Sequence, residues 1–139
     1  MAGEIHVSGL REFNRNLRAI DRDAPKGLRK AGNDAAALVV KAAKPRVPTG
    51  PSAGGHALSS VRASSTRTAA RVSEGSKRFP YMAWLDFGGR VGRNRSVHRP
   101  FVKRGRYLWP AFVDERPAVQ SELERALIVV ARAAGVDVS

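Results

Sequence analysis

Apolar residues recur at helical spacing near both ends of this 139-residue chain, but not in its middle. Spacings of three and four residues place side chains on one face of a helix, which must then be buried. The stripe near the N-terminus is Leu10, Phe13, Leu17 and Ile20, and the stripe near the C-terminus is Val119, Leu123, Leu127, Val130 and Ala134. The short segments between them contain no alternating βαβ pattern. The order of helix, strands and helix therefore predicts an α+β fold.

The N-terminal part predicts a long helical arm that is broken near residue 24. Ser8 can cap the first helix, and Pro25 suits the first turn of a second one. The apolar stripe of this second helix is Leu28, Ala31, Ala35, Leu38, Val39 and Ala42. Gly32 lies within it and weakens the helix by about 1 kcal/mol relative to alanine. We therefore expect a neighbouring segment to pack closely at Gly32.

The middle of the chain predicts a small antiparallel sheet of about three to four strands. The stretches "ALSSVRASST" and "RTAARVSEG" suit a hairpin that turns near residues 65–67, and "PFVKRGRYLW" can supply a further strand. "EIHV", residues 4–7, alternates polar and apolar side chains and predicts another short strand. "FPYMAWLDFGG" fits a helix or a strand, and the glycine pair ends it either way.

Two stretches are predicted to be loops within a single domain that spans residues 1–139. Residues 45–57 contain three prolines and three glycines, which predicts a mobile loop. Residues 89–106 are expected to form a basic loop. Pro110 opens the last helix, Pro117 kinks or restarts it, and Gly135 is a natural C-cap. The chain is too short for two independent cores.

The positive charge is concentrated in the middle of the chain. The net charge is +13, and residues 35–113 carry fifteen Lys and Arg side chains against two acids, Glu74 and Asp86. The two ends are charge-balanced. Such asymmetry indicates a surface for a protein partner or a polyanion. The alternative is that arginines merely cover solvated loops.

Catalytic groups are sparse. The chain has no cysteine, and its three histidines have no partner at metal-ligand spacing. Glu74 and Asp86 are the only acids in the middle region, so paired-carboxylate chemistry would need Asp86 to find a distant partner. We expect no catalytic residue, no cofactor and no metal. A nuclease in which His98 acts beside Arg99 is the remaining enzymatic alternative.

Nucleic-acid binding is a stronger alternative. Seven Lys and Arg residues lie within residues 90–106 with no acid among them, and Phe101 and Tyr107 are interleaved. Charge contacts with phosphates and aromatic stacking on bases are typical of single-strand binders. No helix-turn-helix, zinc-finger or RNA-binding sheet motif is present. The aromatic residues are equally well explained as core anchors.

Four stretches in a fixed order resemble the small tail-completion or head–tail joining (neck) proteins of long-tailed bacteriophages. They are "AAALVVKAAKPRVPTG", "ALSSV", "YMAWLDFGG" and "RYLWPAF". The matching positions are Ala43, Lys44, Pro48, Thr49, Gly50, Leu58, Ser60, Tyr81, Ala83, Asp86, Phe87, Gly88, Pro110 and Ala111. The resemblance covers about residues 8–134. Asp86 replaces the usual glutamate, "PSAGGHA" lengthens one connection, and Arg90–Arg106 is unusually basic.

The resemblance implies a structural virion protein without catalysis. Copies would assemble as a ring of six or twelve subunits at the neck, between the tail terminator or tail tube and the head connector. The basic loops would face acidic neighbours or packaged DNA. No signal peptide or membrane span is visible, so we expect a soluble protein, made in the host cytoplasm and incorporated into the virion, with no membrane partner.

Two groups of residues carry this interpretation. The proposed interface combines aromatic anchors with a rim of basic side chains, the residue types enriched at protein hot spots. Its members are Tyr81, Trp84, Phe87, Arg93, Arg95, Arg99, Lys103, Arg104, Arg106 and Trp109. The structural motif consists of Pro48, Thr49, Gly50, Asp86, Gly88 and Pro110.

Overall fold

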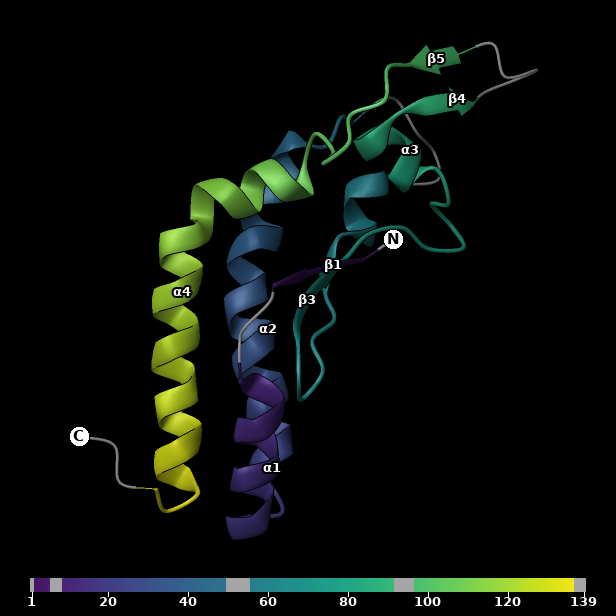
Figure 1. The fold of residues 1–139 in the computed structure, drawn as a ribbon. Helices are drawn as coiled ribbons and strands as arrows, with labels where there is room; N and C mark the ends of the chain where they lie inside the picture. Colours follow the sequence, from purple (N-terminus) through teal and green to yellow (C-terminus); the bar gives the residue numbers. More distant parts are fainter. Residues whose placement is uncertain (1, 6–8, 50–55, 92–96, 137–139) are drawn as a thin grey trace.

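A long antiparallel pair of helices, with small sheets to one side, gives the protein an α+β fold (Figure 1). The computed structural model describes residues 2–5, 9–49, 56–91 and 97–136. The helical segments are α1 (Leu10–Ile20), α2 (Ala24–Ala43), α3 (Met82–Phe87) and α4 (Leu108–Ala133), with 3-10 turns η1 (Lys44–Arg46) and η2 (Ala57–Ser60). The strands are β1 (Ala2–Ile5), β2 (Arg62–Ala63), β3 (Ala70–Ser73), β4 (Gly89–Val91) and β5 (Val97–Arg99).

Helices α2 and α4 form the spine of the molecule. Alanine dominates the buried face of α2, and small side chains let α4 and β3 approach its backbone closely. Figure 1 shows that α4 is bent: its first turns cross the end of α2, and the remainder runs alongside α2. Pro117 lies inside α4 and lacks the N–H that a helix uses at that position, which accounts for a bend in this part.

The core has two clusters along this spine. The larger one joins the second half of α2 to β3, α3 and α4. Its most buried large members are Met82, Val61, Val119 and Val39. The smaller one, at the opposite end, packs Leu10 and Leu17 of α1 against Leu28 of α2. The N-terminal arm therefore folds back on α2 rather than extending from the body.

The described strands form two sheets, and both sheets are antiparallel. The first has the order β1-β3-β2, with Ile5 opposite Ala70 and Arg62 opposite Ser73. The second pairs β4 with β5, with Gly89 opposite Arg99. In Figure 1 the β4–β5 ladder projects from the end of the molecule that holds α3 and the first turns of α4.

Several predictions from the sequence are confirmed. The helical arm breaks between Ile20 and Ala24, and β2 and β3 form a hairpin. Gly32 lies against that hairpin, where a Cβ would come within 2.9 Å of the Ser65 Cβ. Gly135 ends α4 with φ of 86°, a left-handed conformation that relieves the last carbonyls.

Other predictions are wrong in detail. Residues 100–107 contain no strand; the additional strands are β4 and β5, so part of the stretch expected as a basic loop is paired. Leu58 and Ser60 belong to a 3-10 turn before β2, because the Ser60 hydroxyl bonds back to the Ala57 carbonyl at 2.7 Å. Gly9, not Ser8, is the N-cap of α1, and the ambiguous aromatic segment is the helix α3.

The first strand is also shifted from its expected position. It occupies Ala2–Ile5, and residues 6–8 lie outside the described residues. The mobile loop expected over residues 45–57 falls partly outside them as well, because residues 50–55 are not described. On either side of that gap the chain forms η1 and η2.

Candidate functional site

A buried carboxylate joins α3 to the beginning of α4. Asp86 is 0% exposed, and its Oδ1 accepts hydrogen bonds from the backbone N–H groups of Arg106 at 2.6 Å and Tyr107 at 2.8 Å. The first N–H groups of a helix have no partner within the helix and attract negative charge. The Asp86 carboxylate supplies an acceptor and a negative charge at the start of α4. The Asp86 carbonyl accepts further bonds from the Arg106 backbone N–H at 3.0 Å and from the Arg106 guanidinium at 3.1 Å.

Two glycines let the chain fit around this carboxylate. Gly105 has φ of 82°, and a Cβ there would lie 2.6 Å from the Asp86 Oδ1. Gly88 has φ of 99°, and a Cβ there would overlap the carbonyl groups of Arg99 and Pro100. Both positions therefore require glycine for its left-handed conformation and for its lack of a side chain. We call this arrangement of Asp86, Gly88, Gly105 and Arg106 the Asp86 junction.

Glu74 brings a second carboxyl group to the junction. It follows β3 and is 2% exposed. Burial, followed by a hydrogen bond with Asp86 and the negative charge of Asp86, raises its pKa to about 8. The Oδ2 atom of Asp86 receives no hydrogen bond from other described groups, so the proton that Glu74 retains can satisfy it. Glu74 therefore keeps its proton at neutral pH and lies beside Asp86.

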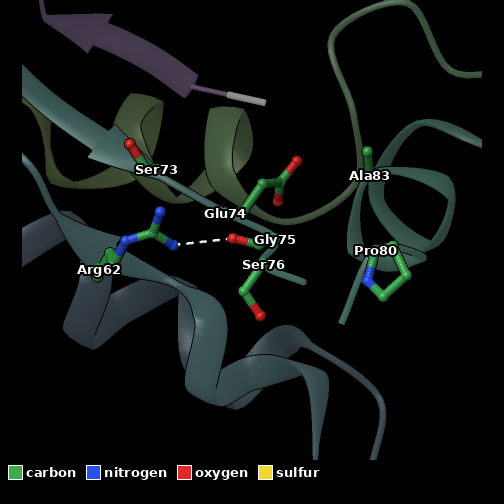
Figure 2. A pocket seen from close by; sticks show the side chains of 7 residues that line it. All are labelled: Arg62, Ser73, Glu74, Gly75, Ser76, Pro80 and Ala83. Carbon is green, nitrogen blue, oxygen red and sulfur yellow. Dashed lines mark hydrogen bonds between the residues drawn. The ribbon is translucent and has the colours of Figure 1, made fainter. Parts of the chain in front are cut away.

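A pocket of about 450 Å³ lies beside Glu74. Its lining includes Arg62 of β2, the residues that follow β3, and Pro80 and Ala83 near α3 (Figure 2). The Arg62 guanidinium donates to the carbonyls of Ser60 at 2.8 Å and Gly75 at 2.9 Å. Figure 2 shows the latter bond across the pocket. Arg62 therefore holds the loop after β3 against η2.

The pocket offers little chemistry. Glu74 can hold a proton at neutral pH, but none of the residues that line the pocket is a histidine or a lysine. The Ser73 hydroxyl forms a short hydrogen bond with the Ser64 hydroxyl across the hairpin. The carboxyl pair is best explained as a link between β3, α3 and α4.

The proposed aromatic anchors lie at different depths around the junction. Tyr81 and Trp109 are 40% and 41% exposed, whereas Trp84 and Phe87 are half-buried. The buried Nε1 of Trp84 has no acceptor among the described residues, and its ring lies close to Gly89. Trp109 packs against Phe112 with ring centroids 5.6 Å apart and ring planes tilted by 50°.

The proposed basic rim divides into two kinds of side chain. Arg99 donates to the Tyr107 hydroxyl at 2.6 Å, and Arg106 donates to the carbonyls of Asp86 and Pro100, so both support the junction. Lys103 and Arg104 are exposed, and the Arg104 guanidinium lies 5.2 Å from the centre of the Trp109 ring. Arg93 and Arg95 lie outside the described residues.

An exposed apolar surface surrounds Trp109. Val113 is 48% exposed and lies one turn after Trp109, so the two share a face of α4. Arg116 packs over Phe112, as Arg104 packs over Trp109. We call this surface the Trp109 face; it consists of Arg104, Trp109, Phe112, Val113 and Arg116. Phe101 and Val102, 72% and 37% exposed, lie in the segment that leads to it.

The remaining motif residues do not gather at the Asp86 junction. Pro48 and Thr49 are exposed after η1, and Gly50 lies outside the described residues. Pro110 is the third residue of α4 and lies in its first turn. N–H groups there have no partner within the helix, so the missing N–H of proline costs no hydrogen bond. Asp86 and Gly88 are the motif members whose chemistry the structure explains.

Sequence reasoning missed Glu74, Gly105 and Tyr107 as parts of this site. Glu74 carried a signal, because it is one of only two acids among residues 35–113. An isolated acid in a basic region is either exposed and paired with a cation or buried with a specific partner. Nothing in the local pattern identified Asp86 as that partner, since the contact depends on how α3 packs against β3.

Within the described residues, no group of three or more His, Cys, Asp or Glu side chains could hold a metal ion. No described helix is long and apolar enough to cross a bilayer. The chain matches no protein-family model, no curated protein and no solved structure.

Proposed function

We propose that this protein is a structural virion protein of a tailed bacteriophage or prophage. It assembles as a ring at the neck or tail end and joins the tail to the head connector, without catalysis. The order of the sequence motifs supports the proposed family and the proposed place in the virion. In the structure, the exposed Trp109 face is the observation that most favours assembly.

Trp109 and Val113 leave apolar area in water on a single face of α4. Removing apolar surface from water is worth about 25 cal/mol per Å², so covering this face with a partner would be favourable. Arginines border the face and are held over its aromatic rings. An aromatic centre with an Arg border is the composition of an interface hot spot. We propose that a second copy of this chain covers the face in the ring.

The position of the Trp109 face suits an assembly. The first turns of α4 lie at the end of the molecule that also carries the β4–β5 ladder (Figure 1). Asp86 fixes the start of α4 relative to α3, so the face is presented by a rigid element. Little conformational entropy would then be lost when a neighbour binds.

The oligomeric state tests this proposal. Trp109→Ser with Val113→Ser should weaken self-association at least about tenfold, because truncating a hot-spot residue costs about 2 kcal/mol or more. Mass photometry over a concentration series would measure the effect, and circular dichroism would verify the fold. The matched control is Ile20→Ser with Val129→Ser, which removes two side chains that are 61% and 53% exposed elsewhere. A wild-type protein that stays monomeric and is absent from virions would overturn the proposal.

The alternative function is that of a basic nucleic-acid-binding protein. Two of the seven basic side chains in residues 90–106, Arg99 and Arg106, are engaged in bonds within the chain. This leaves fewer basic groups there for phosphates. A salt-dependent affinity for DNA that is lost when basic residues within 90–106 are replaced would favour this function, because each phosphate contact contributes a slope of about −0.9 on a log–log plot.

A further inference from the structure

A pocket of about 400 Å³ lies between α1 and the β2–β3 hairpin, apart from the Asp86 junction and the Trp109 face. Four arginines line it together with Asn14 and Thr68: Arg11, Arg15, Arg18 and Arg67. The three on α1 follow spacings of four and three residues, so they share one face of that helix. Arg67 comes from the turn of the hairpin and completes the pocket from the other side.

This pocket is a concentration of uncompensated positive charge. Among the described residues, none of its four arginines has an ion pair or hydrogen bond, and none of the lining residues is acidic. Like charges four residues apart on a helix destabilise it by a few tenths of a kcal/mol. The facing Arg67 adds to that repulsion. The arrangement is unfavourable for the free subunit and becomes favourable when an anion enters.

The other lining groups also suit an anion with several oxygens. Thr68 offers a hydroxyl donor. Asn14 is 7% exposed, and its Oδ1 has no donor among the described residues. Asn14 lines the pocket, and its side-chain NH₂ group is a further potential donor there. Guanidinium groups bind phosphate through paired, charge-assisted hydrogen bonds, and this fork matches phosphate better than an ammonium group does.

We propose that this arginine pocket binds a phosphate group, either in the backbone of DNA or in a free oligophosphate. The inference is independent of the proposed ring assembly, because the pocket and the Trp109 face share no residue. A phosphate would bridge α1 to the β2–β3 hairpin and would stabilise the folded chain by binding only that state.

The test compares two variants of equal charge. Arg15→Gln with Arg67→Gln removes one arginine from each side of the pocket. Arg22→Gln with Arg29→Gln removes two exposed arginines outside it and serves as the control. Both lower the net charge by the same amount, so a difference between them reports the site rather than the overall charge. Circular dichroism establishes that each variant is folded.

Two probes distinguish the sources of phosphate. Fluorescence anisotropy with a labelled DNA duplex measures backbone binding, and a thermal-shift titration with inorganic pyrophosphate measures binding of a free oligophosphate. We expect the pocket variant to lose at least about tenfold in affinity for whichever probe binds wild type, since charge-assisted bonds contribute about 1.5–3 kcal/mol each. For DNA, its log–log salt slope should also fall by about 2.

The control variant should retain affinity within about threefold of wild type. Binding of DNA alone would identify a backbone site, and a response to pyrophosphate alone would identify a small-molecule site. Equal losses in the two variants would mean that only overall charge attracts the probes, and this would overturn the proposal. Failure of both probes to bind wild type would overturn it as well. Neither result bears on self-association, which has its own measurement.

Discussion

The carboxylate of Asp86 accepts the backbone N–H of Tyr107 at 2.8 Å, across 21 positions of sequence, and thereby fixes the start of α4 on α3. The same oxygen holds the N–H of Arg106. Glu74 approaches from the end of β3, and burial, followed by a hydrogen bond with this carboxylate, raises its pKa. One buried acid therefore joins three elements that pack around the end of α2, and the Trp109 face begins directly after it.

Replacement of Asp86 by alanine should strongly destabilise the protein. The buried Tyr107 N–H and the protonated Glu74 carboxyl would lose their acceptor, whereas the Arg106 N–H would keep its bond to the carbonyl of residue 86, and each buried unsatisfied donor costs about 1–3 kcal/mol. We expect the free energy of unfolding to fall by about 3–5 kcal/mol, measured by urea denaturation. Asp86→Asn keeps one acceptor oxygen but loses the negative charge and places an NH₂ group in the site. This variant should lower the free energy of unfolding by less, about 1–2 kcal/mol. Equal stability of Asp86→Ala and wild type would show that the junction does not hold α4.

Replacement of Gly105 by alanine should disrupt the same junction from the opposite side. A Cβ at this position would lie 2.6 Å from the Asp86 Oδ1, and the backbone has φ of 82°. Gly135 provides a matched control, because it has φ of 86° but nothing within 4 Å of its Cβ position. Both variants incur the left-handed strain of about 1 kcal/mol, and only Gly105→Ala adds the clash. We expect a difference of at least about 1–2 kcal/mol between them in urea denaturation.

Stability should decrease with rising pH between about 4.5 and 8. Glu74 has its pKa raised from 4.5 to about 8 in the folded chain, so the native state holds a proton that the unfolded state releases in this interval. Stability from this group is therefore highest below pH 4.5 and is lost as pH rises through about 8. Solvent in the adjoining pocket screens part of the effect, and we expect a loss of about 1–3 kcal/mol.

The variant Glu74→Gln isolates this contribution. The amide cannot ionise but can still donate a hydrogen bond to Asp86. We expect its stability to exceed that of wild type at pH 8.5 and to vary less over the interval, whereas the exposed control Glu124→Gln should follow wild type. Parallel stability curves for Glu74→Gln and wild type would contradict a raised pKa of Glu74 in the folded chain.

The long helices could be predicted from the sequence because their apolar stripes are many residues long. Val119 and Leu123 of α4, and Ala31 and Ala35 of α2, are buried as their spacing requires. Ile20 fits the α1 stripe but is 61% exposed, because α1 ends there and no element covers its last turn. Short strands carry too few residues for a periodic signal, which is why β5 was predicted several residues too late.

The candidate site could be predicted only in part. Asp86 and Gly88 stood out through a motif, and the structure supplies their physical roles. The pairing of Asp86 with Glu74 depends on tertiary packing and leaves no periodic trace in the sequence. The arginine pocket was missed for a similar reason: the spacing of Arg11, Arg15 and Arg18 is visible in the sequence, but their approach to Arg67 depends on the fold of the hairpin.

The basic residues around the Trp109 face should matter for assembly rather than for folding. Lys103 and Arg104 are exposed, so changing both to glutamate should leave the subunit folded and soluble. Arg106 is bonded to the Asp86 and Pro100 carbonyls, so Arg106→Glu should destabilise the fold instead, by about 1–3 kcal/mol. Several like-charge contacts with an acidic neighbour together cost several kcal/mol, so Lys103→Glu with Arg104→Glu should block joining.

Electron microscopy of particles made without this protein tests the central claim most directly. The gene would be deleted from the phage or prophage that carries it and supplied again as wild type, as Trp109→Ser with Val113→Ser, or as Lys103→Glu with Arg104→Glu. We predict unjoined heads and tails, or tails with defective ends, in the deletion and in both variants, with soluble variant protein present and normal particles restored by wild type. Joined, infectious particles at normal yield in the deletion would contradict the claim.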